Sequence, residues 1–333
     1  MSWKIVVTTP SAVEVGQSAL DRLRNNGCEV VIPSRLGPLP AEAIRAAMDG
    51  CDAVLACLDD YSAAVLESSE AASLKIISRW GVGYDRVDVA AANRLGIVVG
   101  FTPGLLDNAV ADYTWAMLMS LARGVHHGHT SMIGGKWQPD WGTDIGGKTL
   151  GIIGTGRIGQ VVAKRATGFD MTVLGYDLYP SPAAEALGVH YVSLQELLER
   201  SDFVSLNCAL TPETRGIIDA KRIGTMKPTA LLINTARGAL VDESALVAAL
   251  NGGTIGGAAL DAYTEEPLPP DHPLRTCPNL LLTPHQAPKA SDTGAKVSDA
   301  AVTNIMELMH GRRPPLIVNP EVLDSSTLRA SLC

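Results

Sequence analysis

Three glycines follow an apolar run in residues 151–160, which read GIIGTGRIGQ. They are Gly154, Gly156 and Gly159, and the segment after them, QVVAKRA, has the composition of a helix. Glycine costs conformational entropy on folding, so such a cluster is typical of a backbone that turns tightly or approaches a ligand closely. A strand, a GxGxxG turn and a helix in this order predict a site that holds the pyrophosphate of a dinucleotide at the helix N-terminus.

An acidic residue at the end of the next predicted strand strengthens this interpretation. Asp177 closes the strand at residues 172–176, about 20 residues after the glycines, where dinucleotide-binding domains carry an acid. Its carboxylate would accept hydrogen bonds from the ribose 2′- and 3′-hydroxyls and would repel a 2′-phosphate. We therefore predict NAD(H) rather than NADP(H); the alternative, a structural glycine turn with a solvated aspartate, is much weaker.

Three further groups follow later predicted strands. Arg237 comes after the strand at 231–233, Glu266 comes shortly after the strand at 257–260, and His285 closes the strand at 280–282. Ligands of parallel sheets bind at the carboxyl ends of strands. A cation that holds a carboxylate or polarises a carbonyl, together with a proton donor, suits hydride chemistry on a keto or hydroxy acid. Each residue alone has a plainer reading, as a salt bridge, a solvated acid or a structural histidine.

The elements that must position these groups alternate along the chain. Short apolar runs alternate with helical segments twice, first in residues 1–102 and again from residue 148 onward, which predicts an α/β fold with parallel sheets covered by helices on both faces. A long apolar helix is expected at residues 109–123. The loop at 134–147 carries Trp137 and Trp141, which we expect to be exposed, and either packs on its own domain or buries a subunit interface. The polar tail from residue 324 is expected to be poorly ordered.

Composition narrows the class of protein. The chain has 333 residues, 46% hydrophobic residues, a net charge of -8 and a pI of about 5.4. The absence of a basic patch argues against nucleic acid and against an anionic membrane surface, and no apolar run is long enough to span a bilayer. No signal peptide is expected. The six cysteines are scattered without a CxxC pair, so we expect reduced thiols in a cytoplasmic protein and no metal site.

Taken together, the motifs resemble those of the D-isomer-specific 2-hydroxyacid dehydrogenases. The segments that carry the resemblance are SRWGVGYDRVD at 78–88, GIIGTGRIG at 151–159, MKPTALLINTARGALVDE at 226–243, GAALDAYTEEPL at 257–268 and NLLLTPH at 279–285. The resemblance implies two Rossmann-like domains. A cofactor domain at 103–286 would be inserted into a discontinuous substrate domain made of residues 1–102 and 287–333.

The resemblance also implies roles for individual residues. His285 would be the general acid and base, Glu266 would hydrogen-bond it and keep it protonated for reduction, and Arg237 would bind the substrate carboxylate and carbonyl oxygen. Val82 and Gly83 would offer backbone N–H groups to the carboxylate. NAD would be bound by the three glycines and Asp177, and by Arg157, Ile158, Cys208, Thr235, Ala236 and Asp261. By analogy, the family also implies a homodimer formed through the helix at 109–123 and the tryptophan loop.

Two positions bear on the substrate. Where many members continue with an aliphatic residue and glycines after the histidine, this chain has Gln286-Ala287-Pro288, so Gln286 is predicted to read a polar substituent. Arg79 precedes the Gly81–Gly83 turn, at a place where phosphoglycerate-oxidising members bind phosphate; a salt bridge within its own domain is an equal alternative.

The region after the third strand carries Asp59 and Asp60, which would repel a phosphate dianion. We therefore predict an enzyme that reduces a small unphosphorylated 2-oxo acid such as glyoxylate, hydroxypyruvate or pyruvate. The alternatives are a short D-3-phosphoglycerate dehydrogenase and, more remotely, an NAD(H)-sensing corepressor.

Overall fold

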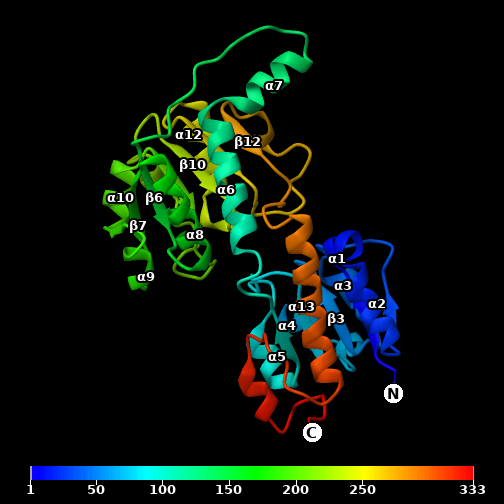
Figure 1. The fold of residues 1–333 in the computed structure, drawn as a ribbon. Coiled ribbons are helices and arrows are strands. Elements are labelled where there is room, and N and C mark those ends of the chain that lie inside the picture. The colour runs from blue at the N-terminus through cyan, green and yellow to red at the C-terminus, as the bar shows by residue number, and fades with distance from the viewer. Residues whose placement is uncertain (1, 333) are drawn as a thin grey trace. The chain divides into compact units, whose positions relative to one another are not determined.

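The computed structural model describes residues 2–332, which divide into two compact units. Unit 1 contains residues 2–106 and 288–332, and unit 2 contains residues 107–287. The boundaries lie a few residues from those expected at 102/103 and 286/287. Each unit is an α/β layer structure whose strands are all parallel (Figure 1).

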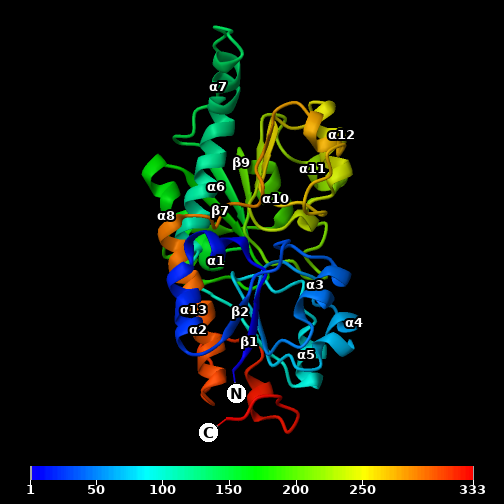
Figure 2. The ribbon, with the colours of Figure 1, turned by 90° about the vertical axis from the view of Figure 1, so that its right-hand side faces the viewer.

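Unit 1 is built on a five-stranded sheet in the order β2-β1-β3-β4-β5. Its strands are β1 (Lys4–Val7), β2 (Glu29–Val31), β3 (Ala53–Ala56), β4 (Ile76–Arg79) and β5 (Val98–Gly100). Its helices are α1 (Pro10–Val15), α2 (Gln17–Asn25), α3 (Ala41–Met48), α4 (Ala63–Leu66), α5 (Val89–Leu95) and α13 (Ser291–Met309), with 3-10 turns at Ser69–Ala71 and Pro320–Asp324. Figure 2 shows α1, α2 and α13 on one face of the sheet and α3, α4 and α5 on the other. Because both faces are covered, the strands are continuous apolar runs, as the sequence indicated.

The C-terminal helix α13 completes unit 1. The Ser78 hydroxyl on β4 donates to the carbonyl of Ala301 at 2.8 Å, and the indole N–H of Trp80 donates to the Ser298 hydroxyl at 2.9 Å. The tail beyond it also has defined partners, in contrast to the expected poor order. The Arg329 guanidinium donates to the carbonyls of Ala71 and Leu74, at 2.6 and 3.0 Å.

Unit 2 is built on a seven-stranded sheet in the order β12-β11-β10-β9-β6-β7-β8. Its strands are β6 (Thr149–Ile153), β7 (Thr172–Tyr176), β8 (Val189–Tyr191), β9 (Phe203–Leu206), β10 (Leu231–Asn234), β11 (Gly257–Leu260) and β12 (Leu280–Leu282). Its helices are α6 (Asp107–Ala122), α7 (Val125–Ile133), α8 (Arg157–Ala166), α9 (Pro182–Glu185), α10 (Leu194–Arg200), α11 (Ala220–Ile223) and α12 (Glu243–Asn251), with 3-10 turns at Thr167–Phe169, Gly238–Leu240 and Pro273–Thr276. The strand order reverses between β6 and β9, and the carboxyl ends of strands at such a switch point form the usual ligand-binding edge.

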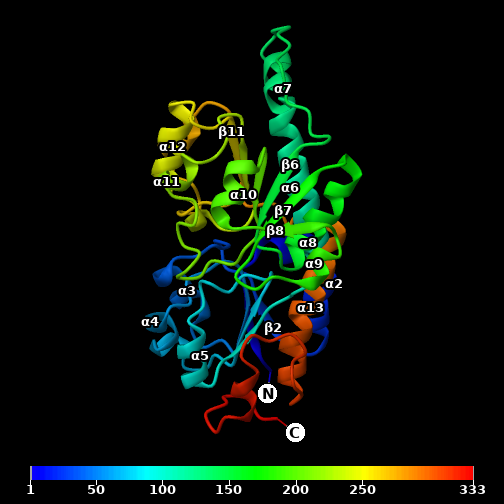
Figure 3. The same ribbon diagram turned by 90° about the vertical axis from the view of Figure 1, so that its left-hand side faces the viewer.

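The core of unit 2 has two apolar layers, one on each face of its sheet. One layer joins α6 and α8 to the strands through residues such as Leu118, Val162 and Ile152, and the other joins α10 and α12 through residues such as Leu197 and Leu246. Figure 3 shows α10, α11 and α12 on the face opposite α6 and α8. Fully burying an aliphatic side chain of this size contributes about 1.5–3 kcal/mol, so these layers fix the strand ends that carry the site.

Two elements of unit 2 were not predicted. The strand β8 is short, with one buried residue, and α7 has no buried residue, so neither has an apolar period to read. Gly124, at φ +62°, separates α7 from α6, and α7 extends away from the sheet of its unit (Figure 1). Among residues 2–332, no helix is long and apolar enough to cross a membrane.

Candidate active site

The glycine turn has the geometry that its spacing predicted. Gly154 follows β6 at φ +93°, and a Cβ there would lie 2.4 Å from the backbone nitrogen of Cys208. A Cβ on Gly159 would lie 2.1 Å from the carbonyl oxygen of Gly154, so the first turn of α8 packs directly on the strand end. A Cβ on Gly156 would meet nothing within 4 Å. The backbone at Gly156 is therefore open to a ligand. A pyrophosphate requires such open space, because it must approach the backbone closely.

Asp177 lies beside this turn. One of its carboxylate oxygens, Oδ2, accepts hydrogen bonds from the backbone N–H of Thr155 at 2.7 Å and from the Thr155 hydroxyl at 3.2 Å. The other oxygen accepts from the N–H of Tyr179 at 3.0 Å. The acid is thus fixed at the end of β7 next to the open glycine. These residues fit NAD: the carboxylate of Asp177 would bind its ribose, and the glycine turn would hold its pyrophosphate.

The other predicted cofactor residues lie along the same edge of the sheet. Arg157 begins α8 and donates through Nε to Asp107 of α6 at 2.8 Å, while Ile158 packs against the apolar layer.

Cys208 follows β9, and burial raises the pKa of its thiol to about 11. Thr235 follows β10, and its hydroxyl lies 2.7 Å from that of Thr114. Ala236 donates its N–H to the side chain of Asn234 at 3.0 Å.

His285 and Glu266 form a close pair. Nδ1 of His285 lies 2.8 Å from Oε2 and 2.9 Å from Oε1 of Glu266. Burial works to raise the pKa of Glu266, but the hydrogen bond and charge of His285, the N–H of Tyr263 and the charge of Arg237 hold that pKa below its usual value. A carboxylate accepts hydrogen bonds, so Glu266 holds Nδ1 of His285, and Nε2 is the ring nitrogen that a ligand could reach.

The loop that carries His285 is held by Asp261. The backbone of His285 is in the left-handed region at φ +50°, which residues other than glycine rarely adopt. Asp261 is 1% exposed, and its carboxylate accepts hydrogen bonds from the Thr283 hydroxyl at 2.6 Å and from the N–H groups of Gln286 and Ala287 at 2.9 and 2.7 Å. Burial raises the pKa of Asp261, an effect that these donors oppose. Asp261 therefore holds the loop of His285 in place, and the cofactor contact predicted for Asp261 stays a prediction.

Arg237 lies at the end of β10, between two features that fix its loop. The side chain of Asn234 donates to the carbonyl of Arg237 at 2.8 Å, and a Cβ on Gly238 would lie 1.9 Å from the carbonyl carbon of Tyr263. The guanidinium donates to the carbonyl of Ala236 at 2.8 Å, and its charge acts on Glu266. A cation, an acid and a histidine thus converge at the carboxyl edge of the sheet.

Two residues near this site, Tyr113 and Asn207, were not predicted. The hydroxyl of Tyr113 on α6 accepts a hydrogen bond from Nε2 of Gln286 at 2.5 Å, a contact between residues 173 positions apart that no local pattern reveals. Asn207 follows β9 beside the glycine turn, and its Oδ1 is buried without a hydrogen-bond partner among residues 2–332. A polar residue at the end of a predicted strand was the signal that could have found Asn207.

The predicted substrate residues Arg79, Val82 and Gly83 belong to unit 1. Arg79 ends β4 and is 4% exposed, and its guanidinium donates to backbone carbonyls of its own unit. Asp59 is fully buried, and its carboxylate accepts hydrogen bonds from the Thr8 and Tyr61 hydroxyls at 2.5 and 3.2 Å. The carboxylate of Asp59 therefore has a structural role, and its repulsion of a phosphate dianion stays a prediction.

A family model for the NAD-binding domain of D-isomer specific 2-hydroxyacid dehydrogenases matches residues 115–287, which lie within unit 2. The chain belongs to this family. Unit 2 is therefore its NAD-binding domain, and the protein is an NAD-dependent oxidoreductase acting on 2-hydroxy acids, as its sequence predicted. Among residues 2–332, no group of three or more His, Cys, Asp or Glu side chains could hold a metal ion.

Relatives of this dehydrogenase include enzymes with two different names. Glyoxylate reductase of Korarchaeum cryptofilum is 43% identical over 82% of this chain and 84% of its own length. D-3-phosphoglycerate dehydrogenase of Methanocaldococcus jannaschii is 41% identical over 77% of this chain, but over only 49% of its own length. The TT0316 protein of Thermus thermophilus has a similar structure, with a TM-score of 0.84, 41% identity, and coverage of 95% of this chain and 99% of that one.

Proposed function

We propose that this dehydrogenase reduces glyoxylate or another small unphosphorylated 2-oxo acid, such as hydroxypyruvate or pyruvate, with NADH. The observation that carries the proposal is the match with glyoxylate reductases over most of both chains, together with the His285–Glu266 pair beside Arg237. A short D-3-phosphoglycerate dehydrogenase is the alternative, since a D-3-phosphoglycerate dehydrogenase is among the relatives of this chain, 41% identical over 77% of it. No contact among residues 2–332 favours the corepressor alternative.

The chemistry follows from the site residues. NADH supplies a hydride when it is bound, and Gly154, Gly156, Gly159 and Asp177 would hold it. Arg237 would bind the carboxylate and draw charge toward the carbonyl oxygen, a task suited to the fork of a guanidinium. His285 would hold a proton on Nε2 and deliver it to that oxygen, while Glu266 stabilises the imidazolium. In the oxidative direction His285 would accept the same proton.

The remaining contacts are also proposals. Val82 and Gly83 would bind the substrate carboxylate through their backbone N–H groups. Gln286 would present its amide, oriented by Tyr113, to a polar substituent of the substrate. If so, replacing Gln286 by Ala should lower the preference for hydroxypyruvate over pyruvate, and an unchanged preference would contradict this role.

The experiment that tests the proposed function is a comparison of substrates. NADH consumption is measured with glyoxylate, hydroxypyruvate, pyruvate, longer 2-oxo acids and 3-phosphohydroxypyruvate, with NADPH in parallel. We expect kcat/KM to be highest for a small unphosphorylated acid with NADH. A preference for the phosphorylated acid would replace this proposal by the phosphoglycerate dehydrogenase alternative. NADH binding without turnover of any acid would favour the corepressor alternative.

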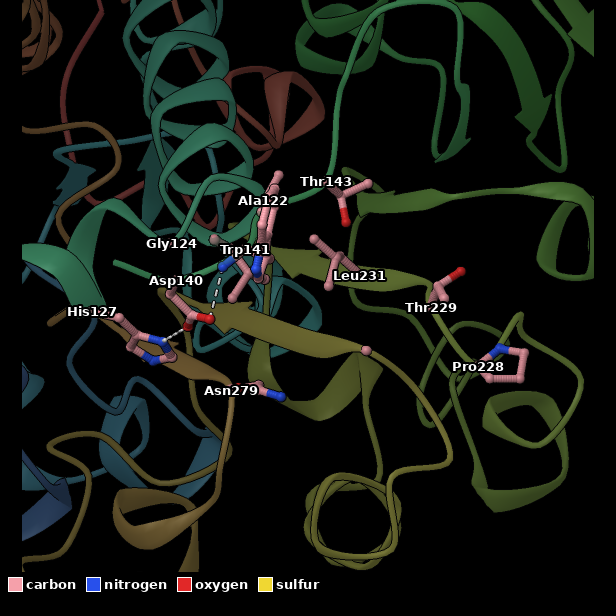
Figure 4. Close-up of a pocket in the computed structure, with 13 residues that line it drawn as sticks. Ala122, Gly124, His127, Asp140, Trp141, Thr143, Pro228, Thr229, Leu231 and Asn279 are labelled. Carbon is pink, nitrogen blue, oxygen red and sulfur yellow. Dashed lines mark hydrogen bonds and ion pairs between the residues drawn. The ribbon is translucent and has the colours of Figure 1, made fainter. Parts of the chain in front are cut away.

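We also propose a homodimer, in the cytoplasm. Val125, Ile133, Trp137 and Trp141 project from α7 and its loop, and the two tryptophans are 87% and 99% exposed. Beside them lies a cavity of about 240 Å³ at the amino ends of the strands, lined among others by Ala122, Trp141 and Leu231 (Figure 4). Exposed aromatic side chains next to a cavity suit a self-complementary interface.

The proposed location in the cytoplasm is supported by the cysteines. The five that the structure describes are free thiols, which fits a reducing compartment: Cys28, Cys51, Cys57, Cys208 and Cys277.

Sedimentation velocity at micromolar concentration tests the dimer. The wild-type protein should sediment as a dimer, and the double substitution Trp137→Ser, Trp141→Ser should shift it toward the monomer. Ile32→Ser, at a partly exposed position of unit 1, is the matched control and should leave the mass unchanged. A monomeric wild-type protein would refute the proposed dimer.

A further inference from the structure

The side chain of Arg79 joins two loops of unit 1. Its Nε donates to the carbonyl of Gly83 at 2.9 Å, which lies in the turn after β4. Its Nη1 donates to the carbonyl of Ala56 at 3.1 Å and to that of Cys57, both at the end of β3. Two of the three guanidinium nitrogens thus donate to backbone carbonyls, and the residue is 4% exposed.

The loop at the end of β3 is itself fixed. The N–H of Cys57 donates to the Thr8 hydroxyl at 3.0 Å and to the Asp59 carboxylate at 3.2 Å. Asp59 is fully buried and also accepts the N–H of Leu39 at 2.9 Å. A buried carboxylate with this many donors is a rigid anchor, so Arg79 connects the turn after β4 to a fixed point.

The turn itself is held at both ends. Gly81 has φ +138°, and its N–H donates to the buried hydroxyl of Thr102 at 3.0 Å, while the N–H of Thr102 donates back to the carbonyl of Gly81 at 3.0 Å. At the other end, the carbonyl of Gly83 is bonded by Arg79. Between these two points, the N–H groups of Val82 and Gly83 donate to no other residue in the described part of unit 1. They are the groups that we propose to bind the substrate carboxylate.

We propose that Arg79 is a positioning residue: it holds the Gly81–Gly83 turn so that its N–H groups are preorganised for the carboxylate of a 2-oxo acid, and it does not contact a substrate phosphate. This inference rests on the proposed function and makes its substrate class more specific. A guanidinium can bridge several carbonyls in a fixed geometry, whereas the ammonium of lysine cannot reproduce the planar fork. A phosphate ligand would instead need its donors available at the surface.

The test uses Arg79→Lys and Arg79→Met, with Arg86→Met as the matched control, because Arg86 is an exposed arginine in the segment after the same turn. Binding of oxamate, an unreactive 2-oxo acid analogue, is titrated in the presence of NADH, and KM and kcat are measured with glyoxylate and with 3-phosphohydroxypyruvate. We expect both Arg79 variants to raise the oxamate Kd and the glyoxylate KM about 10- to 100-fold, the scale of a small misplacement of binding groups. The NADH Kd should stay within about twofold, and Arg86→Met should resemble wild type.

Other results would overturn the inference. A loss confined to 3-phosphohydroxypyruvate would make Arg79 a phosphate ligand, and a lowered Tm with unchanged oxamate Kd and glyoxylate KM would leave it a purely structural residue. If neither Arg79 variant folds, Thr102→Val removes the anchor at the other end of the turn. An unchanged oxamate Kd in that variant would show that fixing the turn does not matter.

The inference and the proposed function fail in different ways. Wild-type protein that binds oxamate but does not reduce glyoxylate would refute the proposed substrate, while the Arg79 effect on oxamate binding could still be measured. Wild-type protein that neither binds oxamate nor turns over any 2-oxo acid would refute both.

Discussion

The imidazole Nδ1 of His285 lies 2.8 Å from Oε2 of Glu266, although the two residues are 19 positions apart on different loops. The carboxylate holds one ring nitrogen and leaves the other for the substrate. This arrangement supports the proposed roles, in which His285 transfers the proton and Glu266 orients its ring.

His285→Ala should therefore lower kcat by about 10²- to 10⁴-fold, the usual contribution of a general acid or base. NADH binding, followed by fluorescence titration, should be unchanged, because the cofactor cradle lies on other loops. His190→Ala, at an exposed position of β8, is the control and should retain full activity. Turnover of His285→Ala near the wild-type rate would contradict the assignment.

Glu266 should make stability depend on pH in the acid range. Its pKa is lowered in the folded protein, so its contribution to the free energy of unfolding is fully present above its ordinary pKa of about 4.3 and is lost as the pH falls through the folded value. Urea unfolding of wild type and Glu266→Gln at pH 3 to 7 should show a difference that shrinks below about pH 4. A difference that is constant across this range would mean that ionisation of Glu266 does not stabilise the fold.

Asp177→Ala should weaken NADH binding about 10- to 100-fold, since hydrogen bonds to a charged group contribute about 1.5–3 kcal/mol. The same change should narrow the gap between NADH and NADPH, because it removes the charge that repels a 2′-phosphate. The Kd values of both cofactors measure this. Glu185→Gln, which removes an exposed charge on α9, should leave both Kd values unchanged. If Asp177→Ala and the wild-type protein prefer NADH over NADPH to the same extent, Asp177 does not select the cofactor.

Two glycines of the turn should respond differently to alanine. Gly156 has φ −68° and open space around its missing Cβ, so Gly156→Ala should keep the wild-type Tm but weaken NADH binding. A Cβ on Gly159 would collide with the carbonyl of Gly154, so Gly159→Ala should lower stability by roughly 1–3 kcal/mol as well.

Gly168→Ala provides the control for this pair, because its missing Cβ also faces open space but lies away from the turn. Thermal unfolding and NADH titration of the three variants separate the two effects. Unimpaired NADH binding by Gly156→Ala would mean that no ligand approaches this glycine closely.

Local patterns along the chain were enough to predict the repeating features of this protein. Apolar runs at strand spacing, the three glycines and the acid after the next strand predicted both parallel sheets, the cofactor and the reaction class. Even the order of Arg237, Glu266 and His285 could be read, because each follows an apolar strand. The strand β8 and the helix α7 were not predicted, because they bury too few side chains to show a regular spacing of apolar residues.

The partner of each polar side chain, in contrast, depends on the tertiary structure. Parallel pairing of β11 with β12 sets Leu260 opposite Leu282, and this register brings Asp261 to the backbone of the His285 loop. Pairing of β3 with β4 sets Ala56 opposite Arg79, so the Arg79 guanidinium can donate to the carbonyl of Ala56. Asp59 is likewise fully buried, and its hydrogen-bond partners come from distant parts of the chain. Such partners are joined by strand register and packing between distant segments, and neither leaves a pattern in the neighbouring sequence.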